Sequence, residues 1–464
     1  MSGQGRRGSQ PSKRRSVTAR ELALDVLTQV EQEGAYSNLL LNTALQKASL
    51  EKGDAGLATE LVYGTISRLN TLDYFLDRFV KKGTAKLQPW VRALLRLSLY
   101  QIMYLDRIPE HAVVSEAVNL AKRRGHQGIS GMVNGVLRNI LRQRDELVIP
   151  EDLPAADRIS LSHSHPKWLV ERWIKQYGAD AAEAICKANN EPPAVSVRVN
   201  TTMISRDGML EEMSKSGVDA APSELSPYGI IVRSGGNMAH TDWYREGMIS
   251  IQDESSMLVA ETVCPAPGMR VLDCCAAPGG KTAHMGEMMK DDGTIIANDL
   301  HSHKQKLIAE QAKRLGLDSI MTVTGDALEL GKNYEPSSFD RILLDAPCSG
   351  LGVIRRKPDL KWAKKPEDIE EIAKLQRELL QSVSGLVRPG GVLVYSTCTI
   401  EPKENEETIA AFLAKHPNFE IADDESGSMS RALKNALPKG GGVQLLPQHF
   451  HSDGFYIVRL RRLS

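Results

Sequence analysis

Two stretches of the chain combine an apolar run with a thiol at its end. The first run, Arg341–Leu344, is followed by Asp345-Ala346-Pro347-Cys348-Ser349-Gly350, an acid, a proline and a cysteine in close succession. The second, Gly391–Thr397, is rich in β-forming residues and stops at Cys398. Buried parallel strands end in this way where they deliver side chains to a crevice. The sequence therefore predicts two strand ends that carry reactive thiols.

A cysteine considered singly is more often a small buried hydrophobe than a nucleophile. The pairing of Cys348 and Cys398 at two strand ends argues against that interpretation for these two. Cys186 and Cys264 have no such context and are interpreted as core residues, and Cys274 as a packing residue. We predict no metal site, because the chain has no CxxC motif and its two His-x-His pairs lack partners at ligand spacing.

A turn of small residues, Asp273–Thr282, follows a predicted strand and leads into a predicted helix. Only small residues let a ligand approach the backbone closely. The turn fits neither GxGxxG nor a P-loop, which argues against dinucleotides and triphosphates. Asp299, at the end of the next predicted strand, is where an acid usually binds a ribose hydroxyl pair. Asp326 follows the third strand and is suited to accept from the exocyclic amine of adenine.

The elements that must position these residues alternate between strand and helix from Met269 onward. The predicted segments are Arg270–Asp273, Thr282–Met289, Thr294–Asn298, Lys304–Leu315, Ile320–Thr324, Arg341–Asp345, Ile369–Leu386 and Val392–Thr397. This alternation predicts an α/β domain with a largely parallel, doubly wound sheet. Late strands around Val443–Leu446 and Gly454–Leu460 add antiparallel pairing.

The rest of the chain reads as two smaller domains. Apolar residues recur at helical spacing from Val17 to Arg144, for example Val133, Val136, Leu137 and Ile140. We predict a basic, disordered tail at 1–16, an all-helical domain at 17–148, a small α+β domain at 149–255 and the catalytic domain at 256–464.

Composition bounds the class of protein. The chain has 464 residues, 41% of them hydrophobic, and no apolar run near the roughly 18 residues that a membrane helix needs. Its six cysteines do not form a disulfide framework, so a reducing cytoplasm fits best. Lys+Arg and Asp+Glu both count 58, so affinity for nucleic acid must come from local basic clusters. Such clusters are the tail, with Arg6, Arg7, Lys13, Arg14 and Arg15, and the segment after Cys348, with Arg355, Arg356 and Lys357.

Three motifs together, Cys275–Thr282, Asp345–Gly350 and Ser396-Thr397-Cys398, resemble those of the RNA cytosine-C5 methyltransferase family. The segments Arg20–Leu27 and Val133–Asn139 resemble the NusB-like RNA-binding helical domain, and the chain from about Val17 is similar to bacterial 16S rRNA methyltransferases of this family. The resemblance implies a Rossmann-like catalytic domain and S-adenosyl-L-methionine as cofactor. The residues that it implies for cofactor binding are Cys275, Ala276, Ala277, Pro278, Gly279, Gly280, Lys281, Asp299, Asp326 and Asp345.

The two cysteines compete for the role of nucleophile. In cytosine-C5 enzymes that act on DNA the attacking cysteine follows a proline, which would favour Cys348. The resemblance to the RNA family implies the reverse, with Cys398 attacking C6 of cytosine and Cys348 assisting release. Residue chemistry alone leaves this choice open. Asp345 is expected to hold the N3 and amine edge of the base.

The expected partner is 16S rRNA, with the target cytosine single-stranded or flipped out of its stack and the enzyme acting as a monomer without metal or membrane. Arg355, Arg356 and Lys357 are placed to hold flanking phosphates. Two alternatives stay open. One is the same chemistry on tRNA, and the other is an RNA-binding assembly factor with an inert methyltransferase domain.

Overall fold

The computed structural model describes residues 17–48, 50–422 and 442–463, so the predicted basic tail lies outside the described residues. The chain divides into two units, Met1–Val170 and Glu171–Ser464. The division falls inside helix α9 (Lys167–Tyr177). The proposed domain boundaries at 148/149 and 255/256 stay predictions.

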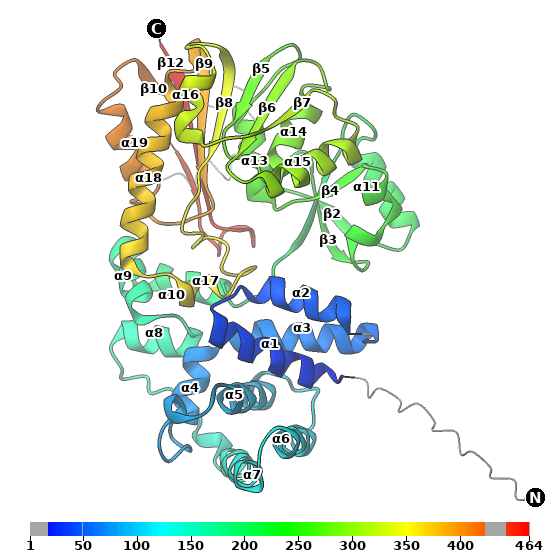
Figure 1. Cartoon of the computed structure of the whole chain (residues 1–464), viewed down its shortest axis with the longest axis vertical. Coiled ribbons are helices and arrows are strands. Elements are labelled where there is room, and N and C mark those ends of the chain that lie inside the picture. The colour runs from blue at the N-terminus through cyan, green and yellow to red at the C-terminus, as the bar shows by residue number, and fades with distance from the viewer. Residues whose placement is uncertain (1–16, 49, 423–441, 464) are drawn as a thin grey trace, which may run out of the picture. The chain divides into compact units, whose positions relative to one another are not determined.

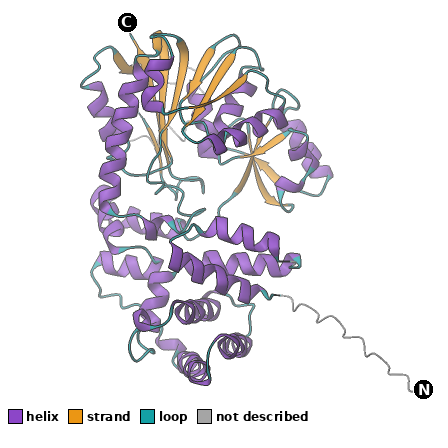
Figure 2. Ribbon diagram, in the orientation of Figure 1, coloured by secondary structure: helices purple, strands orange, loops and turns teal. Residues whose placement is uncertain are grey.

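The described part of the first unit is helical, as predicted, and Figure 2 shows only helices and loops in it. Its helices are α1 (Ala19–Glu33), α2 (Ser37–Lys47), α3 (Lys52–Ser67), α4 (Leu69–Leu76), α5 (Pro89–Tyr104), α6 (Glu110–Arg124), α7 (Gln127–Arg142) and α8 (Ala155–His163). Helix α1 begins where the Thr18 side chain accepts from the Glu21 N–H, and it ends at Gly34, whose φ is 64°. Helix α7 buries the predicted apolar stripe. Helix α8 joins this unit through α4, since the Thr71 hydroxyl donates to the Leu161 carbonyl at 2.5 Å.

The second unit begins with the end of α9, α10 (Ala179–Ala188) and a small antiparallel sheet. The sheet has the order β2 (Asp219–Pro222), β3 (Gly229–Ser234), β1 (Val195–Val199) and β4 (Ile249–Ile251). Helix α11 (Arg206–Lys215) packs on it through Met209 and Met213, which are buried with Val197 and Ile249. Two short helical segments, Met238–His240 and α12 (Asp242–Arg245), connect β3 to β4. This is the predicted α+β part of the chain.

A larger sheet forms the rest of the second unit. Within the described residues its strands follow the order β10 (Phe419–Ile421), β12 (Phe455–Arg462), β9 (Val387–Thr397), β8 (Phe339–Asp345), β5 (Arg270–Asp273), β6 (Thr294–Asp299) and β7 (Ile320–Thr324), and β11 (Val443–Leu445) pairs with β12. The strands from β9 to β7 are parallel, whereas β12 runs antiparallel to β9, β10 and β11. The predicted parallel sheet with late antiparallel strands is therefore confirmed (Figure 1).

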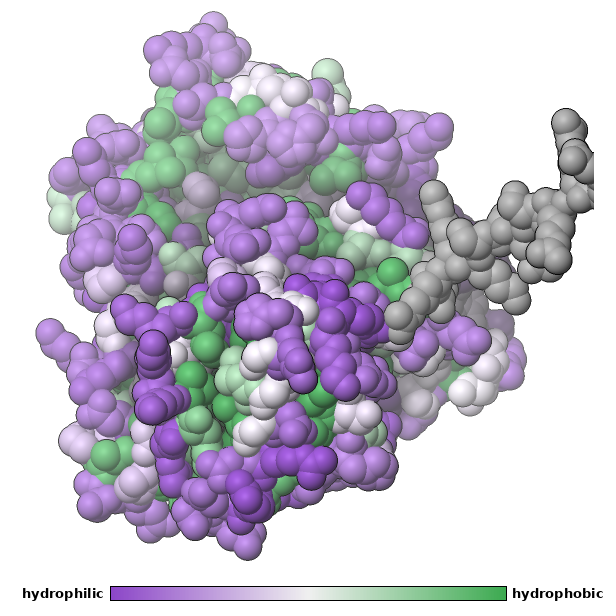
Figure 3. Space-filling model, turned by 60° about the horizontal axis from the view of Figure 1, so that its bottom comes forward, coloured by the Kyte–Doolittle hydropathy of each residue, from purple (hydrophilic) through white to green (hydrophobic). Residues whose placement is uncertain are grey.

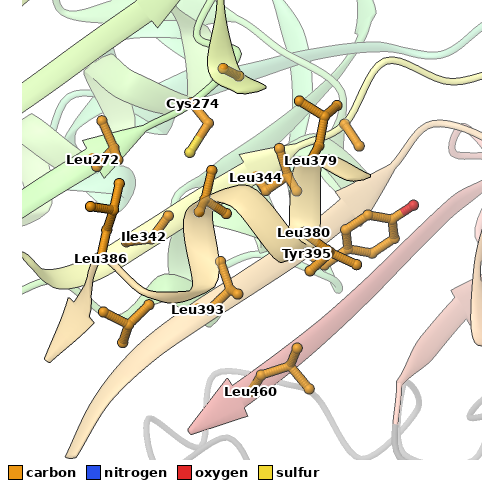
Figure 4. Close-up of a cluster of buried hydrophobic side chains, with 14 of the residues drawn as sticks. Leu272, Cys274, Ile342, Leu344, Leu379, Leu380, Leu386, Leu393, Tyr395 and Leu460 are labelled. Carbon is orange, nitrogen blue, oxygen red and sulfur yellow. The ribbon is translucent and has the colours of Figure 1, made fainter. Parts of the chain in front are cut away.

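Helices cover both faces of this sheet. They are α13 (Glu254–Val263), α14 (Gly280–Met288), α15 (Ser302–Leu315), α16 (Leu330–Asn333), α18 (Pro366–Ser384) and α19 (Glu406–Leu413), and the short helix α17 (Leu360–Ala363) belongs to the connection from β8 to α18. Alternate residues of each central strand point to opposite faces, so Leu272 and Ile342 pack with α18, whereas Val271 and Leu343 pack with α13 and α14. Figure 4 shows the first of these clusters, in which Leu379 and Leu380 of α18 lie over Leu344 and Leu393. The two cores make the sheet a rigid base for the site.

The surface in the view of Figure 3 is mostly hydrophilic, with apolar residues showing between polar ones. This is what amphipathic helices leave exposed once their apolar stripes are buried. Among the described residues, no helix is both long enough and apolar enough to span a membrane.

Candidate active site

The predicted reactive residues lie at one edge of the large sheet. Strands β5, β6, β8 and β9 are parallel, so their carboxyl ends meet at the same side. Asp273, Asp299 and Asp345 are the last residues of β5, β6 and β8. Asp345 pairs in register with Ser396 of β9, and Cys398 follows two residues later. The strand ends therefore bring the acids and the thiols together.

A cavity of about 480 Å³ opens at this edge. Its wall includes Asp273, Lys281, Asp345 and Cys398. The small-residue turn lines it as well, through Cys275, Ala276, Ala277, Pro278 and Gly280. One cavity thus combines the predicted cofactor turn, the predicted base-holding acid and one of the two thiols.

Lys281 and Asp345 form an ion pair inside this cavity, with 2.6 Å between Nζ and Oδ2. The other carboxylate oxygen of Asp345 accepts from the Ser396 hydroxyl at 2.8 Å. Burial lowers the pKa of Lys281, but the Asp345 carboxylate outweighs burial and the pKa is raised overall. The Lys281 ammonium also lies 5.0 Å from the centre of the Phe455 ring. The pair is therefore held in one orientation.

The two thiols are neighbours, with 3.2 Å between the Sγ atoms of Cys348 and Cys398. The hydrogen bond from Cys348 lowers the pKa of Cys398, and Lys281 and Lys357 lower it further, against burial and the charge of Asp345. The same hydrogen bond raises the pKa of Cys348, and burial adds to that effect. Of the two thiols, Cys398 is therefore the one whose ionisation to the thiolate is favoured.

The cofactor turn is held by backbone bonds to the neighbouring strand. The Ala276 N–H donates to the Asn298 carbonyl at 2.8 Å, and Gly279 closes the turn onto Ala276 at 2.8 Å. Gly279 has a φ of 103° directly before α14, a conformation that favours glycine. Asp299 is buried and accepts from the Ala277 N–H at 3.3 Å. The turn and the acid predicted to bind ribose are therefore in contact.

Asp326 and the residues of the basic cluster differ in exposure and in their hydrogen-bond partners. Asp326 is exposed, and its side chain caps a short helical turn by accepting from Leu328 N–H at 3.0 Å. Arg355 is buried, and its guanidinium donates to the carbonyls of Ala188, His451 and Pro447 at 2.6–2.9 Å. These bonds fix a loop and use three of the five guanidinium N–H donors of Arg355, so its contact with an RNA phosphate stays a prediction.

The other two basic residues of the cluster line the cavity. Arg356 forms ion pairs with Asp253 at 2.6 Å and Asp453 at 2.7 Å. Burial raises the pKa of Asp453 to about 6 even beside this arginine. Lys357 is exposed at the cavity wall. Of the three predicted phosphate contacts, Lys357 has the most accessible charge.

Comparisons with known proteins agree across the whole chain. The sequence profile of the 16S rRNA methyltransferase RsmB/F family matches residues 260–461, that of the NusB family 17–142, and that of the ferredoxin-like domain of RsmF/B-like methyltransferases 165–239. The probable ribosomal RNA small subunit methyltransferase B of Bacillus subtilis is 45% identical over 457 residues, which cover 97% of this chain and 99% of that protein. This chain belongs to the RsmB/F family.

Further relatives of this RsmB/F member support the same assignment. The ribosomal RNA small subunit methyltransferase B of Pseudomonas syringae is 36% identical over 450 residues, with 97% of this chain and 98% of that protein covered. The crystal structure of PH0851 matches 97% of this chain and 100% of its own with a TM-score of 0.80 and 27% identity. A methyltransferase homologue from Pyrococcus horikoshii covers 67% of this chain and 100% of its own, with a TM-score of 0.58 and 29% identity. The predicted family and its NusB-like front end are confirmed.

As an RsmB/F methyltransferase the chain uses S-adenosyl-L-methionine, as predicted. The residues of the cavity fit this group. Among the described residues, Oδ1 of Asp273 is buried without a hydrogen-bond partner and lies on the cavity wall, an acceptor left for a ligand. Burial raises the pKa of Asp273 to about 7. A Cβ at Gly280 would meet only Gln252 atoms at 3.9–4.0 Å, so the cradle is open at the start of α14.

Several residues of the RsmB/F site carry no local sequence signal. Arg198 of β1 is fully buried and donates to the Gly280 carbonyl at 2.9 Å, and it pairs with Glu287 of α14 at 2.8 Å. The small sheet thereby holds the cofactor turn. Asp253, Asp453 and Phe455 also line the cavity from distant parts of the chain. Only long-range packing brings them there.

Among the described residues, no group of three or more His, Cys, Asp or Glu side chains is arranged to hold a metal ion, and the absence of a metal stays a prediction.

Proposed function

We propose that this RsmB/F methyltransferase methylates C5 of a cytosine in 16S rRNA through a covalent bond between Cys398 and C6. The observation that supports this reaction best is the pair of thiols 3.2 Å apart beside the Lys281–Asp345 ion pair. Methylation at C5 through a covalent intermediate requires a thiolate and a fixed acid beside the base, and a second thiol at this distance is placed to assist release. The small-subunit rRNA substrate is that in the names of its relatives.

The chemistry requires activation because C5 of cytosine is a weak nucleophile. Addition of the Cys398 thiolate to C6 forms an S–C bond and moves the ring electrons toward C5, which then bonds to the methyl group. A base removes the C5 proton, the C5=C6 bond re-forms and the bond from C6 to sulfur breaks. Cys348 assists this release from its position against Cys398.

Asp345 holds the N3 and amine edge of the target cytosine. Its carboxylate is oriented by Lys281 and Ser396, so its remaining lone pairs keep one direction. A proton shared between this carboxyl group and N3 neutralises the negative charge that develops on the ring as the thiolate adds, and the fixed carboxyl does not have to reorganise during the reaction.

S-adenosyl-L-methionine supplies the methyl group as an electrophile when it is bound. The residues that would hold it are the turn Cys275–Lys281, Asp299 through the ribose hydroxyls, Asp326 through the adenine amine, and Asp345. Asp299 is anchored to the turn and Asp326 is exposed, so both carboxylates have lone pairs for a ligand. Asp273 adds the unpartnered acceptor described above.

The RNA enters with its target base out of the stack, because a base inside a duplex does not reach a thiol in a cavity. Lys357 and, through its outer edge, Arg356 are proposed to contact the flanking phosphates, and the NusB-like unit is proposed to bind RNA. Arg355 contributes less to this set, because it is buried and three of its five donors are occupied by backbone carbonyls. A cytoplasmic monomer fits this role.

The decisive experiment combines substrate and mechanism. Labelled methyl transfer is measured from S-adenosyl-L-methionine to bare 16S rRNA and to tRNA, with Cys398→Ala and Cys348→Ala alongside the wild type. We expect transfer to 16S rRNA, loss of transfer in Cys398→Ala, and a trapped covalent RNA adduct in Cys348→Ala. Transfer to tRNA alone would favour the tRNA reading, and no transfer to either RNA would favour an inert assembly factor. An adduct trapped in Cys398→Ala would reverse the roles of the cysteines.

A further inference from the structure

Glu404 is fully buried and fixes the turn that carries Cys348. Its Oε2 accepts from the N–H of Ser349, the next residue along the chain, at 2.9 Å. The Gln376 side chain of α18 donates to the same oxygen at 3.0 Å and to the Pro347 carbonyl at 2.9 Å. The backbone on both sides of Cys348 is therefore held by one buried carboxylate and the amide beside it.

Asn405, the next residue, fixes the turn that carries Cys398 in the same way. Its Oδ1 accepts from the Thr397 hydroxyl at 2.6 Å and its Nδ2 donates to the Thr399 carbonyl at 3.1 Å. The Ser349 and Thr399 hydroxyls, each one residue beyond a cysteine, are 2.8 Å apart. Two consecutive residues thus hold the two thiols opposite each other.

The charged groups that act on the two thiols are Glu404, Asp345, Lys281 and Lys357. Asp345 disfavours a thiolate at both positions. The Glu404 carboxylate acts on Cys348, whereas the two lysines act on Cys398. Burial raises the pKa of Glu404 above its ordinary value, and its bonds from Ser349 and Gln376 limit that rise because they favour the ionised form.

We propose that Glu404 is the positioning residue that keeps the two thiols unequal. Through Ser349 it holds Cys348 in place as the protonated donor, and its charge leaves Cys398 as the thiolate. This inference rests on the proposed function, in which Cys398 attacks, and assigns a cause to that choice. Glu404 itself touches neither substrate nor cofactor and acts through the cysteines.

The test is the alkylation rate of each cysteine in the full chain. Wild type and Glu404→Gln are treated with iodoacetamide near roughly pH 8, and the Cys348 and Cys398 peptides are followed by mass spectrometry. Glutamine keeps an acceptor for Ser349 but removes the charge. We expect the ratio of Cys398 to Cys348 alkylation to fall by about tenfold, the change that one pKa unit produces. An unchanged ratio in a folded variant would overturn the proposal.

Two matched variants separate charge from structure. Glu404→Asp keeps the charge, so it should retain most of the wild-type ratio, and an equal loss in Asp and Gln would overturn the electrostatic role. Glu261→Gln removes a buried carboxylate of α13 that accepts from Ser226, and it should leave the ratio unchanged. If thermal unfolding shows that Glu404→Gln does not fold, Gln376→Met removes the amide that orients Glu404. Its ratio should fall in the same direction, and an unchanged ratio there would also overturn the proposal.

The outcome is independent of RNA and of the cofactor. Alkylation reports on the thiols of the protein alone, whereas adduct trapping reports on the methylation reaction. A normal adduct with an unchanged alkylation ratio in Glu404→Gln would refute the role of Glu404 and leave the proposed function standing. A shifted alkylation ratio in Glu404→Gln, together with no RNA adduct in Cys348→Ala, would support the role of Glu404 and refute the proposed function.

Discussion

Lys281 acts on two groups of the site, since it pairs with Asp345 and lowers the pKa of Cys398. In Lys281→Gln the pKa of Cys398 should rise, so a smaller fraction of the thiol is ionised at neutral pH. Methyl transfer at pH 7 should fall by about 10- to 100-fold, and the acid limb of the pH–rate profile should move to higher pH. Rates measured between about pH 6 and 9 check both effects.

Lys306→Gln is the matched control for this prediction. Lys306 lies on α15 and is largely exposed, with only a 3.8 Å ion pair to Glu310 on the same helix. Such pairs contribute little to stability. This variant should keep the wild-type profile. An acid limb that stays in place in Lys281→Gln would mean that Lys281 does not tune the thiol.

At the scale of elements, the turn between β5 and α14 depends on Gly279. Its φ is 103°, and a Cβ there would lie 3.2 Å from the Ile308 Cα of α15. Gly279→Ala should therefore destabilise the fold by about 1–3 kcal/mol and weaken cofactor binding, because strain and a backbone contact act together. Thermal unfolding and titration calorimetry with S-adenosyl-L-methionine measure the two effects.

Gly316→Ala separates strain from cofactor binding. Gly316 ends α15 with a φ of 67°, and a Cβ there meets nothing within 4 Å. It should cost about 1 kcal/mol of stability and leave cofactor affinity unchanged. Equal cofactor affinity in both alanine variants would contradict a special role for the Gly279 turn.

The parts of the site that the sequence predicts are those encoded locally. Asp345 and Cys398 stand directly after apolar runs, and the edge at which parallel strands end is fixed by topology. Arg355 shows what the sequence does not predict. It stands in a basic cluster, but its partners are the backbone carbonyls of Ala188 and His451, which lie far from it in the sequence. Glu404 and Arg198 also stand in unremarkable sequence and acquire their roles from contacts made across the fold.

For the whole molecule, we predict that cofactor binding and RNA binding depend on different units. Every residue on the wall of the reactive cavity comes from Val195 or later, and the NusB profile ends at residue 142. A fragment of residues 166–464 keeps α9 complete. It should retain cofactor affinity but bind 16S rRNA more weakly than the full chain. Calorimetry with S-adenosyl-L-methionine and filter binding with rRNA measure the two properties. Unchanged rRNA affinity would remove the helical unit from RNA recognition.

The fold classes of both units follow from periodicity, because helical spacing and βαβ alternation survive in any packing arrangement. The boundary between the two units is harder to predict from the sequence. Helix α8 lies after the predicted end of the helical domain, yet Asn70 and Thr71 of α4 bond to its backbone at 3.2 and 2.5 Å. Polar contacts of Asn70 and Thr71 with Ser160, Leu161 and Ser164 make that attachment, and no sequence pattern marks them.

The Sγ atoms of Cys348 and Cys398 are 3.2 Å apart, so the two thiols are close enough to be oxidised to a disulfide. With glutathione disulfide, the Cys398 thiolate would displace one glutathione, and the Cys348 sulfur would then displace the second, closing the protein disulfide and leaving two glutathione thiols. Neither sulfur would then be able to add to C6. Methyl transfer should be lost on such treatment and restored by dithiothreitol, whereas free-thiol titration follows the bond itself. Ribosomal RNA methylation by this protein would thereby decrease under oxidative stress.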